Sequence, residues 1–288
     1  MDKNNYKQIL YKRSMGKRGA EPQTFYFNEN AEIKNRGQVT AYIITALVIV
    51  VLAVVLYFVY PQIQTIVGGD TEPSDYMKTC LEPALEEGMD LVSRQGGYID
   101  PEGYVMYQGN NVKYLCYTSR YYMPCYVQQP LLVPHVEKEL SGYLKAKAKS
   151  CAGELRSYYE ARGYDVTGGN TAEVEVDIAP NRIGVTIDSP MTFTKDTAQD
   201  FRVFRFGKAS KMYSLLMTAV SIIDFESTYG DSEVTLYMQY YPELQIRKVK
   251  AYLGEGGTIY SIKNVKTGEE FTFASRSLAW PGGYGLTA

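Results

Sequence analysis

The feature that most constrains this chain is an uninterrupted apolar run from Val39 to Tyr60, 22 residues without a charged side chain. A helix of that length spans about 33 Å, enough to cross a hydrocarbon core of about 30 Å. Lipid offers backbone groups no partner outside the segment, so the many β-branched residues in the run are compatible with a helix. The run therefore predicts one transmembrane helix over residues 38–60.

Charges on either side of the run predict its orientation in the bilayer. Residues 1–37 carry eight basic and four acidic side chains, and Lys34 and Arg36 directly precede the run. After it, the first basic residue is Lys78, and the part of the chain beyond the run holds 22 basic and 28 acidic residues. The positive-inside bias makes residues 1–37 a basic cytoplasmic tail or leader and places the rest outside the cell. An acidic outer region also argues against nucleic acid as a partner.

The four cysteines all follow the apolar run, on the oxidising side of the membrane. An even number in that compartment predicts two disulfides, for which three pairings exist. We favour Cys116 with Cys125, which flank a short turn, and therefore Cys80 with Cys151. Zinc is the alternative, but it needs ligands about two to four residues apart, and these cysteines are 36, 9 and 26 residues apart. We expect neither a metal nor a cofactor.

Hydrophobic periodicity beyond residue 73 predicts an α+β fold of antiparallel sheets with about three helices. Residues 61–73 form a linker, followed by a disulfide-braced α+β subdomain (74–166) and a β-rich α+β subdomain (167–288) that divide near 163–169. The helices are expected from a cap at Ser74 to Gly96, from Pro134 to Gly163, and over 209–223. The strands are expected at 103–107, 112–118, 121–127, 173–178, 183–187, 191–194, 201–206, 234–240, 244–252, 258–265 and 270–274.

No residue pattern supports an enzyme. His135 is the only histidine and falls in a first helical turn, where an ordinary surface position is expected. Lys266-Thr267-Gly268 matches one element of a β-lactamase signature, but S-D-N is missing and the S-x-x-K from Ser14 to Lys17 lies in the cytoplasmic tail, so the motif is assigned to a hairpin turn. Glu173, Glu175 and Asp177 alternate with apolar residues, as on the wet side of a hairpin, although such a row could also bind calcium weakly. We expect a protein that is not an enzyme.

The sequence carries two resemblances to known proteins. Arg36-Gly37-Gln38 and the apolar run after it resemble the class III signal of archaeal type IV pilin-like proteins, in which a peptidase cuts between Gly and Gln. That resemblance implies processing at Gly37 and Gln38. The whole chain is also similar to uncharacterised membrane-anchored proteins of small-genome archaea, through the stretches KNRGQVTAYIITALVIVV, CLEPALEEGMDLVSRQGGYI and, near the end, NVKTGEEFTFA. That resemblance implies an envelope location.

Together these features predict a single-pass protein of the cell membrane, with a cytoplasmic amino terminus and an extracellular domain. Tyrosine is unusually frequent, at 27 of 288 residues, and suits contact surfaces as well as sheet faces. We expect a structural or interaction protein, pilin-like or a subunit of a surface assembly. Its partners would be the bilayer and other envelope proteins or copies of itself. In the alternative of an adhesion or ligand-binding module, another cell surface would be a partner. An extracytoplasmic enzyme with an unseen site is the remaining alternative.

Overall fold

The computed structural model describes residues 43–52, 71–251 and 256–278, and the chain divides into two compact units, Met1–Asp70 and Thr71–Ala288. In the first unit, residues 43–52 are helical and their side chains are exposed. None of the helices that the structure describes has the length and apolarity needed to span a bilayer. The predicted span 38–60 extends past 43–52 on both sides, so most of it lies outside the described residues, as do Gly37 and Gln38.

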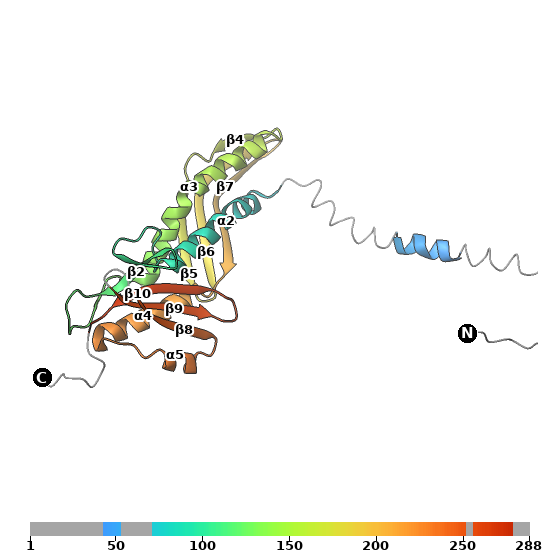
Figure 1. Ribbon diagram of the computed structural model, residues 1–288. Coiled ribbons are helices and arrows are strands. Elements are labelled where there is room, and N and C mark those ends of the chain that lie inside the picture. The colour runs from blue at the N-terminus through green and yellow to red at the C-terminus, as the bar shows by residue number, and fades with distance from the viewer. Residues whose placement is uncertain (1–42, 53–70, 252–255, 279–288) are drawn as a thin grey trace, which may run out of the picture. The chain divides into compact units, whose positions relative to one another are not determined.

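The second unit is α+β, with two sheets and four helices among its described residues (Figure 1). In chain order the elements are α2 (Pro73–Arg94), β1 (Tyr104–Tyr107), β2 (Asn110–Tyr117), β3 (Tyr126–Val127), α3 (Leu132–Glu160), β4 (Asp165–Gly168), β5 (Glu173–Ala179), β6 (Arg182–Thr194), β7 (Ala198–Ala209), α4 (Met212–Tyr229), α5 (Thr235–Tyr240), β8 (Leu244–Ala251), β9 (Gly257–Asn264) and β10 (Glu270–Arg276).

Helices α2 and α3 form an antiparallel pair that is joined by a disulfide. Cys80 of α2 bonds Cys151 of α3, with Cα atoms 5.9 Å apart. Further along, Gly88 allows the helices to approach closely, because a Cβ atom at that position would lie 2.9 Å from the ring of Tyr143. The apolar stripe of α2 is buried, as its spacing predicts. The helix begins at Pro73, with Glu72 as its N-cap and no side-chain cap, so the predicted cap at Ser74 is wrong.

A four-stranded antiparallel sheet packs on α3. In it β6 is central, with β7 on one side and β4 and β5 on the other. The β5–β6 hairpin is confirmed: its apolar residues face the core, and Asn181 takes a positive φ in the turn. Helix α3 also completes the outer edge of β5, since Val176 donates its N–H to Ser141 Oγ and Ile178 donates to Glu137 Oε1.

The second sheet has six strands in the order β1-β2-β10-β9-β8, with β3 beside β2. Its β2–β10 pair is parallel, which corrects the expectation of purely antiparallel sheets. One hydrophobic core joins α2, α3 and α4 to both sheets, and its buried members run from Met77 to Phe273. The boundary predicted near 163–169 falls within this unit.

Two further predictions of secondary structure are wrong. Residues 235–240, expected as a strand, form α5, whose Tyr237 hydroxyl lies 2.8 Å from Ser221 Oγ of α4. Contact with a neighbouring helix outweighs an alternating pattern that is too short to fix a strand. The strand expected at 121–127 shrinks to two residues, since Pro124 has no N–H to donate and Cys125 is bonded to Cys116.

Candidate functional site

Exposed aromatic side chains gather at one end of the second unit. Helix α5 lies against the C-terminal half of α4, and Phe225 and Tyr229 pair on α4 with ring centroids 4.7 Å apart. Tyr240 of α5 is 79% exposed. A surface cavity of about 370 Å³ lies between the two helices, lined by Phe225, Glu233, Leu236, Tyr237, Tyr240 and Tyr241.

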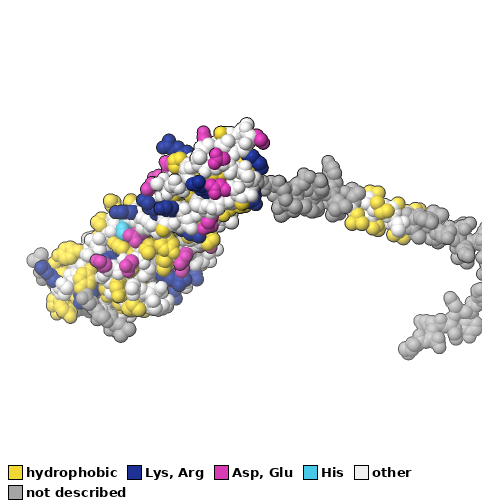
Figure 2. Space-filling model, turned by 90° about the horizontal axis from the view of Figure 1, so that it is seen from above, with side chains coloured by type: hydrophobic (Ala, Val, Ile, Leu, Met, Phe, Trp, Pro, Cys, Tyr) yellow, Lys and Arg dark blue, Asp and Glu magenta, His cyan; other side chains and the backbone are white. Residues whose placement is uncertain are grey.

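The segment between β2 and α3 lies at the same end of the unit (Figure 1). It exposes Tyr121, Tyr122, Tyr126 and Leu131, and Tyr121 is 72% exposed. The Cys116–Cys125 disulfide and the short β3 hold this segment beside α4, which contacts both β2 and β3. We call these residues and those around the α4–α5 cavity the aromatic end. Figure 2 shows hydrophobic side chains gathered at this end of the unit, whereas polar and charged ones predominate at the other.

The aromatic end lies far from the point where the chain enters the unit. Thr71 is held at the C-terminal end of α3, where the Tyr159 hydroxyl donates to the Thr71 carbonyl (2.6 Å) and the Tyr158 hydroxyl donates to Thr71 Oγ1 (3.2 Å). The segment with Tyr121 precedes the N-terminus of α3. Because α3 has 29 residues, its two ends are about 43 Å apart.

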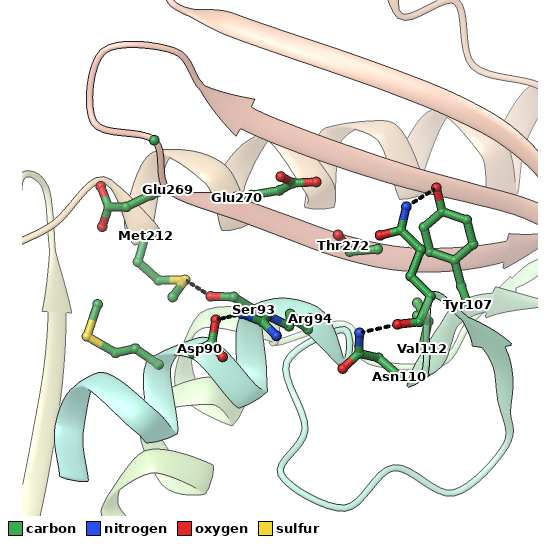
Figure 3. A pocket seen from close by; sticks show the side chains of 13 residues that line it. Asp90, Ser93, Arg94, Tyr107, Asn110, Val112, Met212, Glu269, Glu270 and Thr272 are labelled. Carbon is green, nitrogen blue, oxygen red and sulfur yellow. Dashed lines mark hydrogen bonds and ion pairs between the residues drawn. The ribbon is translucent and has the colours of Figure 1, made fainter. Parts of the chain in front are cut away.

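A second surface feature is a polar slot of about 460 Å³ between α2 and the six-stranded sheet (Figure 3). Glu270 and Thr272 of β10 form one wall, and Asp90, Ser93 and Arg94 in the last turns of α2 lie across from them. The β1–β2 hairpin closes one end with Tyr107, Asn110 and Val112. A neighbouring cavity of about 540 Å³ shares Met89 and Glu269 with the slot.

The four cysteines form the two disulfides expected from the sequence, Cys80–Cys151 and Cys116–Cys125. Disulfides persist in oxidising compartments, so they indicate an extracytoplasmic domain. In the acidic row, Glu173 pairs with Lys145 at 2.8 Å, and Asp177 lies 3.6 Å from Arg182. No group of three or more His, Cys, Asp or Glu side chains suited to a metal ion occurs among the described residues.

His135 is not at an ordinary surface position, in contrast to the prediction. Its ring lies against Tyr98, with centroids 4.0 Å apart, and its Nε2 atom is buried without a hydrogen-bond partner among the described residues. Burial lowers the pKa of His135 from 6.5, and the nearby Lys113 and Lys138 act in the same direction, against the Glu139 carboxylate. The imidazole is therefore neutral in the folded protein near pH 7. It lines none of the cavities described above.

Because its folded pKa is lowered, His135 should make stability fall in mild acid. The unfolded chain binds the proton more readily than the folded one. The stability that the neutral His135 contributes is therefore present above about pH 6.5, and it is lost as the pH falls through the lowered pKa of the folded state. Melting temperatures of the full chain in detergent, measured between neutral and mildly acidic pH, should show this decline. His135→Phe should flatten the curve in that window, and an unchanged slope would contradict the assignment.

Comparison with protein-family models, curated proteins and solved structures gives no match for this chain. The described part of the second unit is an α+β fold with a concentrated aromatic end, and its two disulfides indicate an extracytoplasmic domain.

Proposed function

We propose that this chain is a membrane-anchored protein of the cell envelope, and that its aromatic end binds another envelope protein or another copy of the chain. The amino-terminal tail lies in the cytoplasm, residues 38–60 cross the membrane, and the second unit lies outside. The apolar run, its flanking charges and the two disulfides support that placement.

The aromatic end is the observation that carries the proposed binding role. Large exposed apolar patches on soluble domains commonly mark interaction sites, and tyrosine is enriched at the buried centres of interfaces. An anchor before Thr71 would attach the unit at the opposite end of α3, which leaves the aromatic end free to meet a partner. The same arrangement suits a filament subunit, in which the apolar helix packs with its copies and the aromatic end contacts a neighbour.

Photo-crosslinking in cells that make the full chain tests this proposal. With p-benzoylphenylalanine in place of Tyr240, we expect ultraviolet light to yield defined covalent adducts, because an interface there brings partner atoms within reach of the probe. The matched control replaces the exposed Asp196, in the turn between β6 and β7, and should yield none. Mass spectrometry of the adducts then identifies the partner. Equal yields at both positions, or no adduct at position 240, would refute the proposed surface.

Processing distinguishes the filament form from a simple anchor. A chain cut between Gly37 and Gln38 would begin at Gln38 and release its apolar helix from the basic leader. Amino-terminal mass spectrometry of the protein from its native membrane reads this directly. An intact Met1 in a detergent-stable monomer would remove the basis for the filament form while leaving the anchored form in place.

A further inference from the structure

The six-stranded sheet is split between β2 and β10 over part of its length. The two strands pair in parallel only from Tyr114 and Ala274 onward, although β10 begins four residues earlier, at Glu270. The earlier half of β2 instead approaches the end of α2, where Lys113 donates its N–H to the Gln95 carbonyl (3.4 Å). The slot occupies the resulting gap (Figure 3).

Hydrogen bonds at the two ends of β10 show which of its backbone groups face the slot. Just before the strand, Asn264 donates its N–H to the carbonyl of Glu269, and at its end Thr118 donates to the carbonyl of Arg276. Backbone groups in a strand point alternately to its two sides. Odd-numbered residues of β10 therefore bond β9, and even-numbered residues direct their N–H and C=O toward β2.

Glu270 and Thr272 are even-numbered residues of β10 that precede its pairing with β2, which begins at Ala274. Their two N–H and two C=O groups face the slot, and no hydrogen bond recorded for the described residues satisfies these four groups on that side. Thr272 is only 9% exposed. Backbone groups at buried positions nearly always have partners, so this stretch of strand is suited to a ligand that supplies its own N–H and C=O groups.

Charges around the slot favour recognition of a main chain over recognition of a charged ligand. Arg94 pairs with Asp90 at 2.8 Å, and Arg247 pairs with Glu270 at 3.0 Å. The Glu269 carboxylate accepts hydrogen bonds from neutral groups, including the Ser210 hydroxyl at 2.5 Å. Among the described residues that line the slot, Arg94 is the one cation, and it is already paired. A phosphate group would require a cluster of free cations.

The slot admits one strand, not the edge of a folded sheet, because the last turns of α2 and the β1–β2 hairpin stand opposite β10. We propose that the slot binds a single extended segment of a partner protein as an added strand beside β10. Main-chain hydrogen bonds to Glu270 and Thr272 hold this segment. The site is separate from the aromatic end and does not depend on its role.

Proline at position 272 provides the test, because it removes the Thr272 N–H, one of the two N–H groups that face the slot, and leaves the bonds of β10 to β9 in place. Thr272→Val is the matched control, since it keeps the N–H and loses only the hydroxyl. A random-peptide phage library is selected on the full chain in detergent. We expect enriched peptides to bind Thr272→Val about as tightly as the wild type and Thr272→Pro about tenfold more weakly or worse.

Synthetic copies of the enriched peptides, N-methylated one position at a time, supply a second measurement on the unmodified protein. Methylation at alternate positions should abolish binding, since only alternate N–H groups of an added strand face β10. This result shows whether the peptide binds as an added strand even if Thr272→Pro proves unstable. Failure to enrich any peptide, equal binding to the proline variant, or indifference to N-methylation would each overturn the proposal. An enriched sequence that matches this chain would make a second copy the partner.

Discussion

Replacement of Glu226 by leucine is expected to lower the free energy of unfolding by about 4 kcal/mol. Glu226 is 2% exposed, and its carboxylate accepts hydrogen bonds from the Tyr260 hydroxyl, from Ser275 Oγ at 2.6 Å and from the N–H of Ser232 at 3.2 Å. Leucine would leave three buried hydrogen-bond donors without an acceptor, each at a cost of about 1–3 kcal/mol. Guanidinium unfolding of the full chain in detergent, followed by near-ultraviolet circular dichroism, measures the loss.

A combined variant tests whether unpaired buried donors cause the lower free energy of unfolding of Glu226→Leu. Glu226→Leu together with Tyr260→Phe and Ser275→Ala removes two of the donors, and should be more stable than Glu226→Leu alone, because matched apolar replacement avoids unpaired polar groups. Burial and the Glu226 carboxylate raise the pKa of Tyr260, so its hydroxyl stays protonated as a donor. A combined variant less stable than the single one would show that lost packing, and not hydrogen bonding, governs this site.

The burial of Glu226 could be predicted from the sequence. Glu226 follows Ala219 and Ile222 by seven and four residues, so it lies on the same stripe of α4 as these buried residues, where an acidic side chain needs partners. The identity of those partners was not predictable. Tyr260 and Ser275 come from β9 and β10, which local periodicity cannot place beside α4.

Local patterns predicted the elements whose neighbours are close in sequence. The β5–β6 hairpin follows from strict alternation around Pro180-Asn181, and the stripes of α2 and α3 follow from helical spacing. The parallel β2–β10 pair joins segments about 160 residues apart and left no local trace. Both surface sites depend on such distant contacts. The tyrosine count suited both sheet faces and contact surfaces, and the packing of α5 on α4 shows where exposed tyrosines gather.

Loss of the Cys80–Cys151 disulfide is expected to cost about 4.4 kcal/mol, against about 2.6 kcal/mol for Cys116–Cys125. The bonds span 71 and 9 residues, and the larger loop restricts the unfolded chain more. Each pair is replaced by two alanines, since serine would bury hydroxyl groups at Cys116, Cys125 and Cys151. Unfolding of both variants is compared with that of the wild type under non-reducing conditions.

The two double variants also separate stability from function. Cys80 and Cys151 tie α2 to α3, far from the aromatic end, so their removal should lower the unfolding midpoint while the crosslinks at position 240 persist below it. Cys116 and Cys125 hold the segment that carries Tyr121 and Tyr122, so their removal should cost less stability but weaken partner contact there. If the Cys116–Cys125 disulfide, which closes the shorter loop, proved the more stabilising, chain entropy would not explain the effect of these bonds. Native contacts around Cys125, whose Sγ lies 3.6 Å from Ser275 Oγ, would then account for the difference.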